Sequence, residues 1–479
     1  MKKILALIIT AAIMCSIPGC GNKNEDKTNA GKGAEKLRVF FMDAKTPDVD
    51  LVSEKLSEIT REKLGVNIEM VMFDTDYATK LPMLIATDEQ MDICWTNSDG
   101  FEERARKGAY ADITDLLKNT PKLYNLFDKD FWKGVSYNDR IYAVPTLKEM
   151  AEQWVCYAET DFLEANNIKI DENRTYSLKE LEPILAVLKN NPDRPGFEIG
   201  AKGQHDPMDI LNHFDVITGS IVVNKETDKV ENYYMSKEFE AYVKLMRKWY
   251  DKGYIASDVA TRNGYGQYKS GHKGITYAGY APYNELLSKR YNNDIAVTPI
   301  KMTPAVISNT STCGSAFAIL EKCKDKEKAM KFLELWNTDS KVKNLITYGI
   351  EGKHYTLENG KVKQADDYLK HYLNQNWASG NEFIATLLVN EPDDKFEKFA
   401  EFNKSAEKSR VLGFKPDVTN INDKMLACSG AAAEFTGLLS CGAVEPDEYL
   451  PKLKKALESA GVNDVVKELQ KQYDEWKNR

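Results

Sequence analysis

The sequence predicts an α/β protein of two lobes, in which mixed sheets are flanked by helices and a helical region forms the C-terminus. Near the start of the body, short apolar runs alternate with helical patterns, as in a sheet covered by helices. Residues 140–168 combine a strand, an irregular polar passage and a second strand, which is typical of a chain crossing between lobes. The body of roughly 440 residues is also longer than one core usually supports.

The N-terminus predicts an export signal that ends at a lipid-modified cysteine. Two lysines precede an apolar run, residues 4–14, that is too short to span a bilayer. The motif IPGC at residues 17–20 resembles a bacterial lipobox, in which Cys20 takes a diacylglycerol and a palmitate and residues 1–19 are removed. Pro18 departs from the usual small or β-branched residue, and ordinary cleavage that leaves Cys20 as a plain thiol is the alternative.

The stretch after this cysteine predicts a flexible tether. Residues 20–36 are rich in Asn, Lys and Gly and carry no large apolar side chain, so they cannot bury enough surface to become ordered. Two acyl chains anchor a protein durably, whereas one chain does not. We therefore expect the protein at the extracellular face of the cell membrane of a Gram-positive bacterium, attached by its lipid.

The charge of the body argues against nucleic-acid and anionic-lipid partners. The formal charge of the chain is −8, and removal of Lys2 and Lys3 with the leader changes it to −10. Such an acidic surface repels phosphate groups. Aromatic residues make up 10% of the chain, which suits a folded domain and also a binding cleft.

Six cysteines remain after Cys20, and none falls in a CxxC pair. The sequence therefore favours neither a zinc site nor a redox motif, and we expect no metal and no cofactor. Outside the cell, Cys428 could pair with Cys441, or Cys313 with Cys323. Buried free thiols are equally compatible with the sequence. The six are Cys94, Cys156, Cys313, Cys323, Cys428 and Cys441.

The first part of the body predicts a parallel sheet with helices on it. Gly65 ends the first helix as a natural C-cap. Ligands of such sheets lie beyond the carboxyl ends of the strands, which is where Asp43, Trp95 and Asn97 fall. The alternating segments are strand 37–43, helix 50–64, strand 66–73, helix 77–85 and strand 91–95.

The second part begins after the crossing. Pro145 stops the strand 141–144, and a new strand starts at Trp154. Ser177 and Glu180 form a capping box ahead of an apolar helical stripe. The further expected elements are helix 238–250, strand 273–280, a strand, turn and helix in 310–336, a short helix ending at Gly349, and a mostly helical pattern from about Asp366.

Several segments, taken in order, resemble one known family. Together with the lipobox and tether they are similar to an extracellular solute-binding lipoprotein of an ABC transporter, of the family 1 sugar-binding type. The C-terminal stretch, 413–476, resembles the C-terminal domain of unknown function in the LipO/LplA-like subgroup. The segments are "KGAYADITDLL" (107–117), "YAVPTLKE…QWVCYAETDFLEANNI" (142–168), "GQYKSGHKGITYAG" (266–279) and "DKEKAMKFLELWNTDSKVKNLITYGIEGKHY" (325–355).

The resemblance implies a two-lobed, periplasmic-binding-protein-like fold of type II. The function it implies is capture of a carbohydrate, here an oligosaccharide, in an interlobe cleft by hinge closure, and delivery to membrane permease subunits without catalysis. We expect a monomer. The expected division is 37–148 with 302–350 for lobe 1, and 149–301 with 351–479 for lobe 2.

Sugar recognition needs flat aromatic faces, together with carboxylates and amides for the hydroxyl groups. Tyr280 ends a lobe 2 strand as the counterpart of Trp95, and Glu149 lies in the crossing beside Lys148. Trp377 stands in a loop similar to a Trp-x-x-Gly-Asn signature of the subgroup. Packing, turn or ion-pair roles are the structural alternative for each. The predicted ligand contacts are Asp43, Trp95, Asn97, Glu149, Tyr280 and Trp377.

Two other functions stay open on the sequence alone. The chain has no GxSxG, HExxH or P-loop motif, which argues against several enzyme classes. A surface-attached glycan hydrolase would need only a suitably spaced carboxylate pair, and nothing singles one out. A binding protein for a peptide or another small polar solute is the second alternative.

Overall fold

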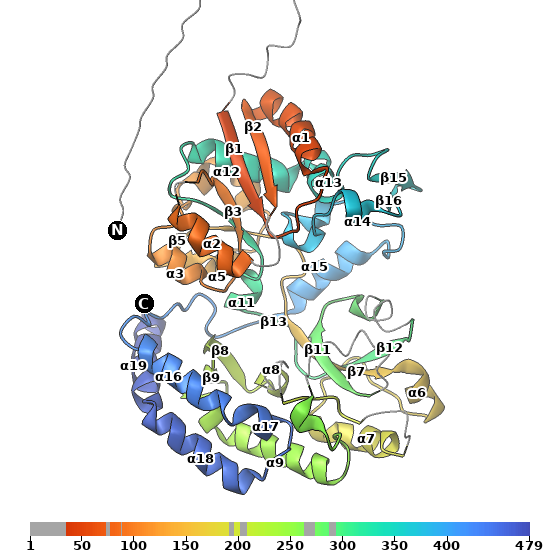
Figure 1. The fold of residues 1–479 in the computed structure, drawn as a ribbon, viewed down its shortest axis with the longest axis vertical. Helices are drawn as coiled ribbons and strands as arrows, with labels where there is room; N and C mark the ends of the chain where they lie inside the picture. The colour runs from red at the N-terminus through yellow and green to blue at the C-terminus, as the bar shows by residue number, and fades with distance from the viewer. Residues whose placement is uncertain are drawn as a thin grey trace, which may run out of the picture.

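The computed structural model describes residues 35–72, 77–87, 89–190, 196–201, 208–262, 274–286 and 294–479. The leader, Cys20 and nearly all of the expected tether lie outside the described residues. Figure 1 shows two α/β bodies, one above the other, with β13 and α11 between them. The two-lobed α/β fold class predicted from the sequence is confirmed.

The first lobe is built on a five-stranded sheet with the order β2-β1-β3-β14-β6. Strands β1, β2 and β3 are parallel, as predicted, and β14 runs antiparallel between β3 and β6. Helix α1 ends at Gly65 in the left-handed conformation, with φ of 69°, as its C-cap position predicts. The strands are β1 (Glu35–Phe41), β2 (Val66–Met72), β3 (Ile93–Thr96), β6 (Val144–Pro145) and β14 (Ala316–Ile319). The helices are α1 (Val49–Leu64), α2 (Tyr77–Ala86), α3 (Phe101–Arg106), α4 (Pro121–Tyr124), α5 (Phe131–Gly134), α11 (Asn309–Thr312), α12 (Lys326–Thr338) and α13 (Ser340–Tyr348).

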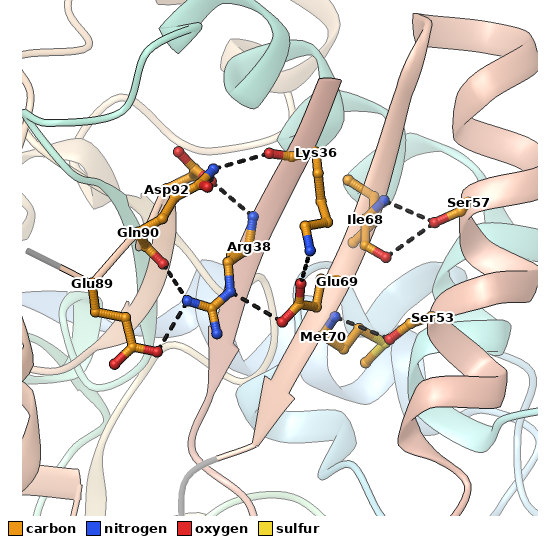
Figure 2. A network of polar contacts seen from close by, with 10 residues as sticks. All are labelled: Lys36, Arg38, Ser53, Ser57, Ile68, Glu69, Met70, Glu89, Gln90 and Asp92. Carbon is orange, nitrogen blue, oxygen red and sulfur yellow. Dashed lines mark hydrogen bonds and ion pairs between the residues drawn. The ribbon is translucent and has the colours of Figure 1, made fainter. Parts of the chain in front are cut away.

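Two polar networks fasten β2 to its neighbours (Figure 2). On one side, the Arg38 guanidinium donates to Glu69 on β2 and to Glu89 in the segment before β3, both at 3.0 Å. On the other side, β2 is the edge strand, and hydroxyl groups of α1 satisfy its outer backbone groups. Ser57 Oγ donates to the Ile68 carbonyl at 3.0 Å and accepts from the Ile68 N–H at 2.9 Å. The helix thereby closes an edge that would otherwise be open to another strand.

Replacing Ser57 with alanine should lower the free energy of unfolding by about 1–3 kcal/mol, because the buried N–H and C=O of Ile68 lose their partner. Urea unfolding followed by circular dichroism measures this change. Glu54→Ala, on the exposed side of the same helix, is the control and should change stability by less than about 0.5 kcal/mol. An equal effect of the two substitutions would contradict the role of Ser57.

The second lobe is built on two small antiparallel sheets. In one, β7 lies between β11 and β12, and in the other β9 lies between β8 and β10. Ser177 and Glu180 form the predicted capping box. The strands are β7 (Gln153–Glu159), β8 (Phe214–Thr218), β9 (Ile221–Asn224), β10 (Lys229–Asn232), β11 (Thr276–Tyr280) and β12 (Val297–Lys301). The helices are α6 (Thr160–Ala165), α7 (Glu182–Leu188), α8 (Met208–Leu211) and α9 (Lys237–Asp251).

Four C-terminal helices complete the second lobe. Helices α17 and α18 pack on α9 (Figure 1), and α19 packs on β10. Leu453 and Leu457 of α18 lie in the same core as Trp249 of α9, and Leu469 of α19 packs with Val230 of β10. The helices are α16 (Asn422–Ala433), α17 (Thr436–Ser440), α18 (Pro446–Ser459) and α19 (Val462–Lys477).

Three crossing segments join the lobes and are hydrogen bonded side by side. Glu152 and Val306 exchange backbone hydrogen bonds of 2.9 and 2.8 Å, and the Glu407 N–H donates to the Ala305 carbonyl at 2.9 Å. Strand β13 (Val306–Ile307) pairs in parallel with β17 (Glu407–Lys408). The first of these crossings follows β6, where the sequence placed it.

The stretch between α13 and the third crossing packs with the first lobe. Tyr372 and Ala378 lie in the core of the five-stranded sheet, although the predicted division gave residues 351–479 to lobe 2. This packing favours a boundary near residue 412, and the division of the chain between lobes stays a prediction. The elements of the stretch are β15 (Tyr355–Glu358), β16 (Lys361–Gln364), α14 (Tyr368–His371) and α15 (Lys395–Ser405).

The six cysteines in the described part of the chain are free and buried, which corresponds to the thiol alternative. Burial raises the pKa of each thiol, to about 12 for Cys94, so these groups are poor nucleophiles. Within the described ranges, none of the helices combines the length and apolar character that crossing a bilayer requires.

Candidate functional site

A cavity of about 330 Å³ lies where the two lobes meet the first crossing. The crossing forms one wall, the end of β11 and the turn after it form a second, and α11 with the turn that follows it forms a third. The lining is therefore shared between the lobes. The residues are Lys148, Glu149, Met150, Ala151, Glu152, Gln153, Trp154, Gly279, Tyr280, Ala281, Asn284, Ser311 and Gly314.

Glu149 and Lys148 place opposite charges on the crossing wall. Lys148 Nζ donates to Glu149 Oε1 at 3.0 Å, and both side chains are largely buried. Burial raises the pKa of Glu149, while the neighbouring lysine lowers it. Asn403 of α15 holds this segment, accepting from the Met150 N–H at 2.6 Å and donating to the Lys148 carbonyl at 2.7 Å. Glu149 thus lies in the crossing and lines the cavity, while its contact with a ligand stays a prediction.

Trp377 lies beside this wall, with 38% of its surface exposed. The Lys148 ammonium sits over its ring, 5.8 Å from the ring centroid. The indole N–H donates to Gln375 Oε1 within the same loop. The ring is therefore held in place by polar contacts and keeps accessible surface, as a stacking platform requires, although it is not among the residues that line the cavity.

Asp43 supports that loop from the first lobe and is itself only 6% exposed. Its carboxylate accepts from the Gln375 backbone N–H at 3.0 Å and from Gln375 Nε2 at 3.2 Å. Burial raises the pKa of Asp43, and the two bonds from Gln375 lower it. Asp43 thus acts on Trp377 through Gln375, a residue that the sequence gave no reason to select.

The opposite wall comes from the second lobe. Tyr280 lines the cavity and packs edge-on against Phe402 of α15, with the ring centroids 6.2 Å apart. Burial raises the pKa of the Tyr280 phenol to about 12, so it stays a neutral hydrogen-bonding group. Tyr283 donates to Asp394, next to α15, and this bond raises the pKa of Tyr283 to about 12. The two tyrosines therefore bring the second lobe against α15.

Two predicted contacts have other surroundings. Trp95 is 3% exposed, and its indole N–H donates to Ser315 Oγ at 2.9 Å, so its ring packs inside the lobe. Asn97 accepts from the Asp99 N–H at 3.2 Å and fixes the turn after β3. Neither residue lines the cavity described above. Trp154, which begins the new strand after the crossing and is not among the predicted contacts, does line the cavity.

A second cavity, of about 600 Å³, lies on the other side of α11. Asn309 and Thr310 of α11 line it, together with the first turn of α3, the β8–β9 turn and residues 414–419. Its charged lining mixes both signs, with Glu102 and Arg106 from the first lobe and Lys415 from the third crossing. It widens the region that a large ligand could occupy between the lobes.

The chemistry of the first cavity suits a neutral, hydroxyl-rich ligand. Trp154 and Tyr280 of the second lobe line it together with one carboxylate–ammonium pair and the Gln153 and Asn284 amides, and Trp377 of the first lobe lies beside that pair. Among the described residues, no group of three or more His, Cys, Asp and Glu side chains could hold a metal ion. The arrangement can bind and orient a solute by stacking and hydrogen bonding.

Comparisons with known proteins place this geometry in context. A family model described as "Bacterial extracellular solute-binding protein" matches residues 56–351, and a model described as a domain of unknown function (DUF3502) matches residues 410–478. A Streptococcus pneumoniae protein named "Carbohydrate ABC transporter substrate-binding protein" is 30% identical over 490 residues, covering 99% of this chain and 98% of that protein.

Solved structures of a solute-binding protein are also similar to this chain over most of its length. The crystal structure of the N-glycan transport solute binding protein NgtS from Streptococcus pneumoniae is 29% identical, with a TM-score of 0.79 over 92% of this chain and 98% of that one. The complex of the same protein with Man5GlcNAc has a TM-score of 0.67 over 93% and 99% of the two chains, again at 29% identity.

Proposed function

The chain belongs to the bacterial extracellular solute-binding proteins, and from this membership we propose that it captures a carbohydrate between its lobes and delivers it to the permease of an ABC importer. The family predicted from the sequence is thereby confirmed, whereas the LipO/LplA-like subgroup stays a prediction. The observation that carries the proposal is the cavity at the crossing, which combines aromatic and amide groups of the second lobe with the Lys148–Glu149 pair of the crossing and Ser311 of the first lobe.

The NgtS relative suggests the class of carbohydrate. It is named for N-glycan transport and has a complex with Man5GlcNAc. We infer that this chain takes an oligosaccharide of the same general kind, with Trp377 from the first lobe and Tyr280 from the second as stacking faces. Glu149 would accept hydrogen bonds from sugar hydroxyl groups, while Asp43 would hold the platform. Asn97 and Trp95 would shape the lobe edge.

Hinge closure would couple binding to transport. A ligand that touches both lobes binds the closed arrangement better than the open one, and it shifts the population by that difference in affinity. The hydrogen-bonded crossings at Glu152, Val306 and Glu407 are the natural hinge. The TM-score of this chain is higher with the NgtS structure that is named without a glycan than with the Man5GlcNAc complex. This supports a difference in lobe arrangement between the two NgtS structures.

A titration of the purified protein tests the proposal. Man5GlcNAc, a pectic oligosaccharide and a mixed peptide library are each added while tryptophan fluorescence and calorimetric heat are recorded. We expect saturable binding of a glycan, which mass spectrometry recovers chemically intact. Binding of peptide alone would overturn the carbohydrate assignment, and cleavage of the glycan would reveal a hydrolase.

We also infer how the protein is held at the cell. Acylated Cys20 would anchor it as a monomer at the extracellular face of a Gram-positive membrane, with no enzymatic role. The support is the lipobox and the family, since extracellular solute-binding proteins work at the membrane that carries their importer. Incorporation of labelled palmitate into the wild type, and its loss in Cys20→Ser, would test the anchor.

A further inference from the structure

Lys343 of α13 is a buried cation directly beneath the Trp377 loop. Its side chain has no exposed surface, which is rare for a lysine. The amine donates to the Ser379 carbonyl and, at 3.4 Å, to the Asn376 carbonyl. These two carbonyls flank Trp377 in the chain. Lys343 therefore holds the loop by hydrogen bonds from the core, one before Trp377 in the chain and one after it.

Other contacts fix the ends of the same loop. Asp43 holds Gln375 at one end. At the other end, the Leu147 N–H donates to the Gly380 carbonyl at 3.1 Å, and the Glu382 N–H donates to the Leu147 carbonyl at 2.8 Å. The middle of the loop is the single turn Asn376–Ala378, in which Ala378 packs into the core and Lys343 supplies hydrogen bonds from the core side.

We propose that Lys343 is a positioning residue for sugar binding, because its buried amine orients the turn that carries Trp377. This inference rests on the proposed function. The amine does not line the cavity, so it acts through the indole rather than on the ligand. Loss of the amine would leave the Ser379 carbonyl without its donor and the Asn376 carbonyl with the Ser379 N–H alone, and it would free the turn to rotate.

The charge of this amine changes in the neutral range. Burial is the main cause that lowers the pKa of Lys343 to about 7; Glu382 of the loop opposes this shift, and Lys395 of α15 adds a smaller contribution in the same direction as burial. Two other charged groups lie near the start of α13: Lys63 of α1 and Asp339, which directly precedes α13. They pair with each other at 2.5 Å. Below this pKa, the ammonium donates strong charge-assisted bonds to the carbonyls, and above it the neutral amine donates weaker ones. Sugar affinity should therefore fall as pH rises through about 7.

The test compares four proteins: wild type, Lys343→Met, Trp377→Ala and the double variant. Calorimetry gives the affinity for Man5GlcNAc at about pH 6 and about pH 8.5. We expect Lys343→Met to weaken binding about fivefold at the lower pH and to lose the pH dependence of the wild type. In the Trp377→Ala background, the same substitution should change affinity by less than about twofold. An undiminished effect in that background would overturn the proposal.

The controls separate the possible failures. Lys341→Met alters an exposed lysine of the same helix and should leave affinity and its pH dependence unchanged. If Lys343→Met does not fold, the wild type must still lose about threefold in affinity between the two pH values while Trp377→Ala does not. Equal profiles would overturn the proposal. A wild type that binds no glycan at either pH would refute the proposed function instead.

Discussion

Replacing Trp377 with alanine should weaken binding of Man5GlcNAc about 30-fold, since truncation of an anchored aromatic contact typically costs about 2 kcal/mol. The indole is 38% exposed, held by Gln375 and covered on one side by the Lys148 ammonium. Such a ring loses little conformational freedom on binding and buries a large apolar face. Because much of the ring is exposed before binding, the free energy of unfolding should change by less than about 1 kcal/mol.

Tyr124→Ala provides the matched control for this substitution. Tyr124 is 41% exposed and stacks on Trp132, with the ring centroids 5.6 Å apart, but it belongs to α4 and not to the loop beside the Lys148–Glu149 wall. Calorimetric titration of both variants should show an affinity loss for Trp377→Ala alone. Unchanged affinity of Trp377→Ala would remove this residue from the site, and an equal loss in both variants would point to a general effect on the first lobe.

Replacing Gly349 with alanine should lower the free energy of unfolding by about 3–4 kcal/mol, through backbone strain and overpacking together. Gly349 ends α13 with φ of 78° and ψ of −140°, a conformation that essentially only glycine adopts. A Cβ atom there would lie 2.2 Å from His354 Nδ1. That nitrogen accepts from the Ile350 N–H at 2.9 Å, and the imidazole stacks on Tyr372.

Urea unfolding of Gly349→Ala and Gly352→Ala compares their free energies of unfolding. The comparison separates the cost of backbone strain from the cost of the Cβ contact with His354. Gly352 also has a positive φ, of 80°, but a Cβ atom there would meet nothing within 4 Å. Its substitution should cost about 1 kcal/mol. Equal losses in the two variants would contradict the contact with His354. The expected difference explains why "YGIEGKHY" carries Gly349 directly before the turn. The motif has a structural role, because it packs the end of α13 against the loop after it.

Features encoded by neighbouring residues could be predicted from the sequence. The first helix ended at Gly65, and the capping box formed at Ser177 and Glu180, because each depends on residues a few positions apart. The first crossing was recognisable because Pro145 ends one strand and Trp154 begins another. Glu149 could be placed near the lobe boundary because it lies in this crossing, and Tyr280 because it ends a strand; both line the cavity.

Features that depend on distant contacts could not be predicted. A strand end indicates the edge of the sheet but not which face a side chain takes, and Trp95 turns inward to Ser315, 220 positions later. Asp43 occupies the predicted edge, yet Gln375 takes up its carboxylate. Lys343 reads as a surface lysine of an amphipathic helix, and only packing of the later loop buries it. The same packing brings residues after 351 to the first lobe.

Small-angle X-ray scattering with and without saturating Man5GlcNAc tests most directly that the lobes close over a sugar. The account predicts that the radius of gyration of the wild type falls when the glycan is added, and that Trp377→Ala needs about 30-fold more glycan for the same change. A radius of gyration that stays constant at full occupancy of the wild type would contradict capture by closure.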